Sequence, residues 1–461
     1  MSWTYKVVST VGLSALLLAS AACAGAGGAG GGGGGGGGNA GGGDNSINVL
    51  MVNNPQMLAL QKHIGEFEKE SGLKVNFTVK PENEMRNQAA QEFANQSGQF
   101  DVATLSNFEI PFYSKNNWLH PLEDIQAYKD DKEFNQADIF PAMTESLKGP
   151  DGKLYGEPFY GESSFLMYRK DVADKAGVTI KDNPTWDEVA AAAAKLDGAE
   201  SGMKGICLRG LPGWGEVFAP LTTVVNTFGG TWFEKDWTPK VNAPEFKEAT
   251  TFYTDLVKAH GEAGAAQAGF AECLTATTQS KAAMWYDATS AAGSLEADDS
   301  PVKGKMAYAQ APVKMTKSSG WLYAWSWAIE KKSAKQDNAW KFISWASSKK
   351  YEELVGAQDG WATVPAGKRE STYANPEYKK AAGAFADATL KAIESADPVN
   401  PGVQPRPTIG IQFVDIPEFT DLGTKVSQDI SGVIAGKKSV DDALNNGQKL
   451  AETVAKKYKG Q

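Results

Sequence analysis

The chain has 461 residues, of which 42% are hydrophobic and 22% are charged, and this is the composition of a globular protein. The length predicts two lobes rather than one small domain. The formal net charge of −9 argues against a surface for nucleic acid or anionic lipid, since both need clustered lysine and arginine.

The N-terminus is expected to be a targeting segment outside the fold. Lys6 precedes an apolar run over residues 7–19, and small residues lead from there to Cys23. The run is shorter than a transmembrane helix needs. It resembles a bacterial lipoprotein signal, although Ser20 stands where that signal usually has leucine. We therefore expect residues 1–22 to be removed and Cys23 to carry a lipid, with cleavage without lipidation as the alternative.

The segment after Cys23 predicts a flexible tether. Residues 24–44 are mostly glycine, with an unbroken glycine run over 30–38. Such a chain cannot pack a core, and about twenty residues of it span roughly 25 Å. We assign residues 23–45 to this linker. The body is then expected outside the cytoplasm, held at the outer face of the membrane by the lipid anchor alone.

The first part of the body predicts alternating strands and helices, and therefore a mostly parallel sheet. Ligands of such sheets bind at the carboxyl ends of the strands. Asn53, Asn54 and Met57 follow the first expected strand, and Glu109 follows the third. Strands are expected over residues 47–52, 73–79 and 100–105, and helices over 57–71 and 82–97.

Later helices carry recognisable start signals. Thr185 and Glu188 have the spacing of a capping box, and helix-forming residues follow them. Ser439 is expected to cap an amphipathic helix near the C-terminus. Residues 338–354 have the periodicity of one helix.

The segment over residues 320–329 (GWLYAWSWAI) alternates aromatic residues with small or aliphatic ones, as a strand with one aromatic face would. Trp321 and Trp325 are expected to face a ligand or a hinge, whereas Tyr323 and Trp327 are expected to pack in the core.

Several segments of the body resemble one family. PFYGESSFLMYRKD (158–171), PTWDEV (184–189), KAAMWYDAT (281–289) and SVDDAL (439–444) are similar to segments of the family 1 extracellular solute-binding proteins of ABC importers. VNNPQM (52–57), GICLRGLPGWGE (205–216), GWLYAWSWAI and IGIQFVDIPEF (409–419) resemble the sorbitol/mannitol, or polyol, subgroup. The resemblance covers nearly all of residues 46–461.

This resemblance implies an α/β fold of the two-lobed periplasmic-binding-protein type. Each lobe would be a mixed or mostly parallel sheet flanked by helices, with the ligand cleft between the lobes. It also implies a monomer that closes on a small polyol or sugar and docks on the transmembrane subunits of an ABC permease, with no cofactor. By analogy, residues 46–158 and 320–366 form lobe I, and residues 159–319 and 367–461 form lobe II.

A polyol site needs hydrogen-bonding groups interleaved with aromatic rings, because hydroxyls both donate and accept while the C–H faces pack on rings. Some of the residues that meet this need have structural alternatives: turn formation for Asn53 and Asn54, helix capping for Glu162, a surface ion pair for Arg209 and core packing for Trp285. The expected ligand-binding residues are Asn53, Asn54, Met57, Glu109, Tyr160, Glu162, Ser163, Arg209, Trp214, Trp285, Asp287, Trp321, Trp325 and Trp361.

Two cysteines remain in the body, Cys207 and Cys273. An even count in an exported chain favours a disulfide, with two buried free thiols as the alternative. No metal is expected, since the three histidines are dispersed and show no metal-binding spacing.

A secreted carbohydrate-active hydrolase is the competing interpretation. Two of the acids Glu109, Glu162 and Asp287 would supply the flanking carboxylates of such an enzyme. The tether and the family resemblance favour binding and transport, without catalysis.

Overall fold

The computed structural model describes residues 45–459. The expected signal peptide, Cys23 and all of the expected linker except Asn45 lie outside the described residues. Among the residues that are described, no helix is both long enough and apolar enough to cross a lipid bilayer.

Five strands form the first sheet, in the order β2-β1-β3-β8-β4. β1 (Ser46–Val52) pairs in parallel with β2 (Lys74–Lys80) and with β3 (Val102–Ser106). α1 (Pro55–Ser71) and α2 (Glu82–Asn95) connect these strands, so the predicted strand–helix alternation is confirmed. The parallel strands therefore end at one common edge of the sheet.

β8 (Tyr323–Ile329) lies between β3 and β4 (Gly156–Glu162) and runs antiparallel to both. All seven residues of β8 are buried, as expected of a strand with partners on both sides. Because β8 is antiparallel to β3, its Trp325 lies opposite Ser106, near the carboxyl end of β3. The aromatic strand therefore begins at the edge of the sheet where the parallel strands end.

A second sheet has the order β6-β5-β7 and is antiparallel throughout. Its central strand β5 (Ser164–Arg169) follows β4 after one residue, Ser163, so the chain passes directly from one sheet to the other. The outer strands are β6 (Met284–Ala288) and β7 (Met306–Gln310). Two sheets with flanking helices agree with the expected α/β fold class.

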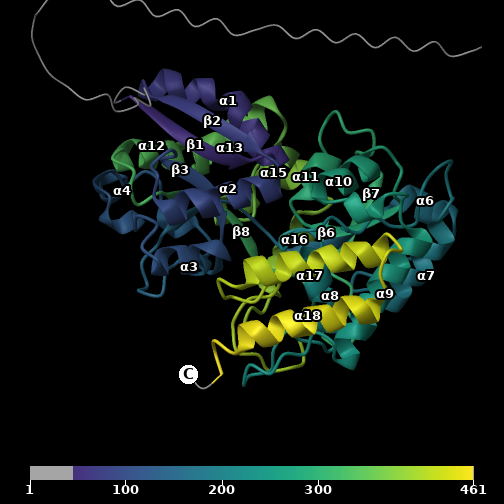
Figure 1. Ribbon diagram of the computed structural model, residues 1–461. Coiled ribbons are helices and arrows are strands. Elements are labelled where there is room, and N and C mark those ends of the chain that lie inside the picture. Colours follow the sequence, from purple (N-terminus) through teal and green to yellow (C-terminus); the bar gives the residue numbers. More distant parts are fainter. Residues whose placement is uncertain (1–44, 460–461) are drawn as a thin grey trace, which may run out of the picture. The chain divides into compact units, whose positions relative to one another are not determined.

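Helices cover both sheets. α17 (Phe419–Ile434) packs along α18 (Val440–Ala455), and both contact α9 (Pro244–His260) (Figure 1). The other helices are α3 (Glu109–Lys115), α4 (Gln126–Asp130), α5 (Pro141–Ser146), α6 (Lys170–Lys175), α7 (Trp186–Leu196), α8 (Phe218–Thr227), α10 (Phe270–Thr278), α11 (Ala291–Leu295), α12 (Gln336–Ser347), α13 (Lys349–Gln358), α14 (Glu370–Ala374), α15 (Pro376–Ala381) and α16 (Ala386–Glu394).

The predicted helix starts are confirmed at two places. The Thr185 hydroxyl accepts a hydrogen bond from the Glu188 amide, and the Glu188 carboxylate accepts one from the Thr185 amide. The Ser439 hydroxyl accepts the Asp442 amide at the start of α18. Each side chain satisfies an amide that the first turn of a helix leaves unpaired.

The prediction of one helix over residues 338–354 is wrong. The chain forms α12 and α13 instead, with Ser348 between them in an extended conformation. The Ser348 hydroxyl accepts a hydrogen bond from the Tyr351 amide at 3.0 Å and so begins a new helix. The apolar periodicity continues through this break, which is why it concealed the cap.

Cys207 and Cys273 form a disulfide in this structure, with 5.6 Å between their Cα atoms. The sequence separation is 66 residues, and closing a loop of that length stabilises the fold by about 4 kcal/mol through the entropy of the unfolded chain. We therefore expect the double variant Cys207→Ser, Cys273→Ser to lose about 4 kcal/mol in free energy of unfolding. Urea denaturation of the oxidised protein and the variant measures this, and equal stabilities would contradict it.

Candidate functional site

A polar cavity lies at the edge of the first sheet where its parallel strands end. About 360 Å³ of non-atom space, part of it continuous with solvent, lies between its lining residues. Side chains reach it from the start of α2, the end of β4, the start of β8 and several loops. The lining residues are Asn54, Glu82, Arg86, Tyr160, Glu162, Arg209, Gly215, Ala219, Phe270, Ala288, Ser290, Tyr323, Trp325, Gln412 and Phe413.

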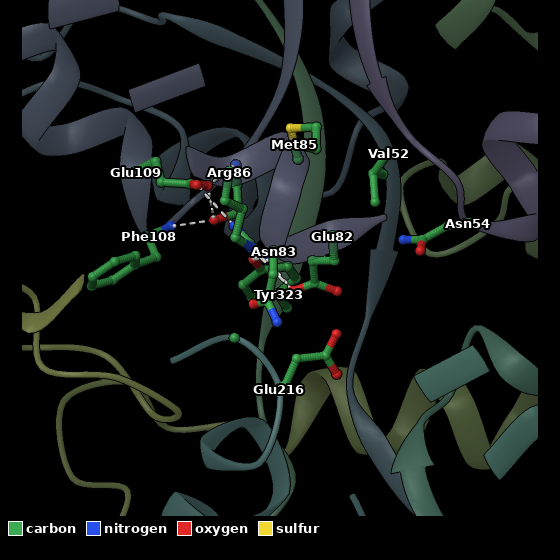
Figure 2. A network of polar contacts seen from close by, with 12 residues as sticks. Val52, Asn54, Glu82, Asn83, Met85, Arg86, Phe108, Glu109, Glu216 and Tyr323 are labelled. Atoms are coloured by element: carbon green, nitrogen blue, oxygen red, sulfur yellow. Dashed lines mark hydrogen bonds and ion pairs between the residues drawn. The ribbon is translucent and has the colours of Figure 1, made fainter. Parts of the chain in front are cut away.

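Arg86 is the central cation on one side of the polar cavity (Figure 2). Its guanidinium donates to Glu109 at 2.8 Å, to Glu82 at 2.9 and 3.0 Å, and to the Tyr323 hydroxyl at 2.5 Å. The rings of Trp214 and Trp325 lie 4.3 and 4.6 Å from its central carbon, a cation–π distance on both sides. These contacts hold Arg86 in one orientation and leave it charged.

Glu109 positions Arg86 from behind the lining. One of its carboxylate oxygens accepts from Arg86, and the other accepts from the Ser106 amide at 2.8 Å and the Ser106 hydroxyl at 2.6 Å. Glu109 is the first residue of α3, where a carboxylate is favoured by the helix dipole. It is 2% exposed, so its charge is available to Arg86 rather than to a ligand.

Arg209 is the second cation of the polar cavity, and Asp287 binds it in a bidentate pair with distances of 2.8 and 2.6 Å. Asp287 also accepts a hydrogen bond from the Trp285 indole at 3.1 Å. Both residues belong to β6 and are fully buried. The Phe270 ring lies 5.3 Å from the Arg209 guanidinium. Asp287 and Trp285 therefore fix Arg209 from behind.

Glu162 is the carboxylate that faces the polar cavity from β4. One of its oxygens accepts a hydrogen bond from the Ser290 hydroxyl at 2.6 Å, and the side chain is 5% exposed. Burial raises the pKa of Glu162 to about 8, because desolvation disfavours the charged form more than Ser290 and Arg209 favour it. Burial likewise raises the pKa of Glu216, which follows the lining residue Gly215, to about 8.

An irregularity in β4 turns Tyr160 and Glu162 toward the polar cavity. The pairing with β8 shifts between Pro158 and Tyr160, and Phe159 packs instead on Trp327 in the core. A bulge of this kind changes which face of the sheet a side chain occupies. The Tyr160 hydroxyl then accepts a hydrogen bond from the Asn54 amide group at 2.8 Å.

The structure places the residues expected from sequence in three groups. Those that line the polar cavity are Asn54, Tyr160, Glu162, Arg209 and Trp325. Those that contact the lining from behind are Glu109, Trp214, Trp285 and Asp287. Those whose side chains are not in the lining and have no such supporting contact are Asn53, Met57, Ser163, Trp321 and Trp361.

Each member of the third group has another position. Asn53 is exposed after β1, and Met57 is buried in the core on α1. Ser163 is buried where its amide donates to Thr289. Trp321 precedes β8 and is buried against Tyr286 of the second sheet, and Trp361 lies over Gly356 of α13.

Tyr323 is a correction to the expectation from sequence, which assigned it to packing. It lines the polar cavity because β8 begins at this residue, beside the end of β3. Trp321 lies two residues before the first residue of β8 and therefore beyond the sheet edge. Trp327 lies deeper in the sheet, packed on Phe159 and Phe342, as expected.

Sequence reasoning missed other lining residues, of which Glu82 and Arg86 carried a detectable signal. They begin the helix after the second parallel strand, and their spacing of four residues allows an ion pair on one helix face. The missed lining residues are Glu82, Arg86, Gly215, Ala219, Phe270, Ala288, Ser290, Tyr323, Gln412 and Phe413.

Within residues 45–459, one group of side chains has the composition and spacing of a metal site: Cys207, Glu262 and Cys273. The two cysteines are joined in the disulfide and have no thiolate to offer. This group therefore does not fit a metal ion.

Comparison with known proteins identifies the family. The model of the bacterial extracellular solute-binding protein family matches residues 53–353. The chain belongs to this family. The solute-binding protein is 37% identical to the mannitol-binding protein of Pseudomonas aeruginosa over 403 residues, which is 87% of this chain and 90% of that protein. Membership of an extracellular family places the folded body outside the cytoplasm.

Solved structures agree with this membership. An ABC transporter solute-binding protein from Agrobacterium vitis, with bound D-mannitol, is 42% identical, has a TM-score of 0.86, and is matched over 90% of this chain and 99% of its own. A second one, from Agrobacterium radiobacter in complex with ribitol, is 23% identical with a TM-score of 0.78, over 89% and 98% of the two chains. At 23% identity, the similarity to this second structure supports the fold alone. The solute-binding protein thus has the two-lobed fold expected from its sequence.

Proposed function

We propose that this solute-binding protein captures a sugar alcohol of the mannitol or sorbitol kind, or a related small carbohydrate, and delivers it to an ABC permease. The observation that carries the proposal is the 42% identity, over nearly the whole body, with a solute-binding protein that holds D-mannitol. The mannitol-binding relative from Pseudomonas aeruginosa supports the same ligand class.

The chemistry of the polar cavity suits an open-chain polyol. Glu82 and Glu162 offer acceptors for hydroxyl hydrogens, and Asn54 and Arg209 offer donors. The rings of Trp325, Tyr323, Phe270 and Phe413 offer apolar walls for the C–H groups. A micromolar affinity needs about 8 kcal/mol, and a hexitol with about twelve non-hydrogen atoms meets this at roughly 0.7 kcal/mol per atom.

Capture is proposed to work by closure of two lobes. We assign residues 46–158 and 320–366 to lobe I and residues 159–319 and 367–461 to lobe II. On this assignment Asn54, Arg86 and Trp325 belong to lobe I, and Arg209 and Phe413 belong to lobe II, while Glu162 ends β4 of the first sheet, close to the proposed boundary. A ligand that contacts both sets favours the closed arrangement by its differential affinity.

We also propose that the protein binds its ligand and catalyses no reaction on it. A hydrolase needs two carboxylates flanking one bond. Of the three acids expected for that role, Glu109 and Asp287 are committed to Arg86 and Arg209 behind the lining, and Glu162 lines the polar cavity. The other lining acid, Glu82, is paired with Arg86. This arrangement favours recognition over bond cleavage.

Attachment to the membrane is proposed from the sequence pattern alone. Cys23 would carry the lipid after removal of residues 1–22, and the glycine-rich linker would let the body reach the permease. We propose that the protein acts as a monomer.

Calorimetric titration of the purified protein tests the proposed function. We expect one-to-one binding of mannitol or sorbitol at micromolar or lower dissociation constant, with arabitol and xylitol weaker because they fill less of the polar cavity. Maltose and a longer glucan serve as controls and should not bind. Binding of an oligosaccharide in place of polyols would overturn the ligand class, and continuous heat from turnover would overturn the binding role.

A further inference from the structure

Acidic groups outnumber basic groups when the lining of the polar cavity and the residues directly behind it are counted together. Of the residues that the structure describes, two cations line the polar cavity, Arg86 and Arg209, both engaged by protein carboxylates, and no lysine or histidine does. A ligand with a carboxylate or phosphate would find no unengaged cation there. The acids at or directly behind the lining are Glu82, Glu109, Glu162, Glu216 and Asp287.

Glu162 is the lining carboxylate that has no ion-pair partner among the described residues. Among residues 45–459, no lysine, arginine or histidine lies within ion-pair distance of it. Ser290 donates to one of its oxygens, and the other oxygen accepts no hydrogen bond from any described residue. The side chain is nonetheless 95% buried and lines the polar cavity, so its unpaired oxygen is open only to a ligand or water held there.

Charged neighbours on the surrounding elements do not neutralise Glu162. Arg209 lowers the pKa of Glu162, but its guanidinium group already donates to Asp287. The charges of Asp287 and Glu82 raise the pKa of Glu162. Glu216 is in a similar position, since its closest cation is Arg209 at 3.4 Å. Figure 2 shows the carboxylates of Glu82 and Glu216 directed into the same space from α2 and from the loop before α8.

Such a carboxylate can be neutralised in two ways: it takes up a proton or it binds a ligand cation. Burial raises the pKa of Glu162 to about 8, so near neutral pH a proton competes with any ligand cation for this carboxylate. An ammonium group presents three donors and a positive charge, and a charge-assisted hydrogen bond is roughly twice as strong as a neutral one. A ligand ammonium would therefore displace this proton and pair with the carboxylate.

We propose that the polar cavity also binds amino-alditols, which are open-chain polyols with an ammonium in place of one hydroxyl, and that Glu162 is the partner of the ammonium. The remaining hydroxyls use the same contacts as a neutral polyol, so this inference rests on the proposed function. By the same charge balance, the cavity rejects polyols that carry a carboxylate or phosphate.

Three ligands of one stereochemistry test this in calorimetric titrations of the purified protein: sorbitol, 1-amino-1-deoxysorbitol and gluconate. At pH 8 we expect the amine to bind at least as tightly as sorbitol, and gluconate at least about a hundredfold more weakly. As the pH falls below 8, the affinity for the amine should drop by up to about tenfold per pH unit, since the proton competes for Glu162, and the affinity for sorbitol should drop less. At pH 7, titrations in buffers of different ionisation enthalpy should show close to one proton released per amine bound, and at pH 8 about half a proton.

Glu162→Gln removes the charge and keeps the shape. The variant should bind both ligands more weakly than the wild type does. Its affinity for the amine should fall at least about tenfold more than its affinity for sorbitol. Glu157→Gln is the matched control, because Glu157 lies on the same strand, is fully buried, and has its pKa raised to about 8 by burial, yet does not line the polar cavity. Glu157→Gln should leave the ratio of the affinities for the amine and for sorbitol unchanged.

The outcomes separate the two proposals. If sorbitol binds and the amine does not, or the amine binds with the pH dependence of sorbitol and no proton release, the amino-alditol inference is overturned and the proposed function stands. If none of the three ligands binds, nor mannitol, the proposed function fails as well. The wild-type pH series decides the question even if Glu162→Gln does not fold.

Discussion

Replacing Arg86 with alanine is expected to lower both the stability and the ligand affinity of the protein. Arg86 is 4% exposed and neutralises Glu82 and Glu109, so its removal leaves two carboxylates at a largely desolvated site without their cation. Removing one partner of a buried pair costs about 3–5 kcal/mol. The affinity for mannitol should fall about a hundredfold, or about 3 kcal/mol, because Glu82 and Trp325 lose the group that orients them.

Chemical denaturation and calorimetric titration measure the two effects of Arg86→Ala separately. Arg169→Ala is the matched control, since Arg169 of β5 is 3% exposed and forms a bidentate pair with Asp171 of α6, but does not line the polar cavity. It should lose stability and keep its affinity. An Arg86→Ala variant that binds mannitol as tightly as the wild type would show that this cavity is not the ligand site.

Asp287→Asn is the second substitution with a large expected effect. The asparagine keeps the shape, but it removes the charge that holds the Arg209 fork at 2.8 and 2.6 Å in a fully buried position. We expect a loss of about 3 kcal/mol in the free energy of unfolding. We also expect mannitol binding to weaken at least about tenfold, since Arg209 can then turn toward Glu216.

Asp101→Asn provides the comparison for this variant. Asp101 is 7% exposed and accepts hydrogen bonds from the Asn48 amide and the Ser333 hydroxyl, on the part of the first sheet away from the polar cavity. Its replacement should affect stability alone. If Asp287→Asn and Asp101→Asn both leave binding unchanged, Arg209 is a structural residue and not a donor to the ligand.

Much of the candidate site was predictable because it follows from local sequence rules. Asn54 comes directly after a buried parallel strand, and the ends of such strands form ligand sites. Glu162 and Tyr160 belong to a segment that resembles the polyol-binding subgroup, and both line the polar cavity. Trp325 belongs to an alternating aromatic strand whose pattern alone indicates a buried strand.

Residues whose roles depend on contacts between distant segments were not predictable in the same way. Glu109 and Asp287 were expected to touch a ligand, but each binds an arginine from another part of the chain. Gln412 and Phe413 come from a segment without helix or strand, and nothing in the pattern places them beside β8. Pairing of this kind is decided by side chains that lie far apart in the sequence.

The amino-acid sequence alone was enough to determine the α/β class, the capping of two helices, and the family to which the chain belongs. These features depend on hydrophobic periodicity, on caps a few residues long and on contiguous motifs. Only the tertiary structure decided that Tyr323 and not Trp321 lines the polar cavity, and that Arg86 and Arg209 are held by buried carboxylates. The physical reason is that strand register and ion-pair partners are set by long-range packing, and a shift of one or two residues along a strand moves a ring from the ligand to the core.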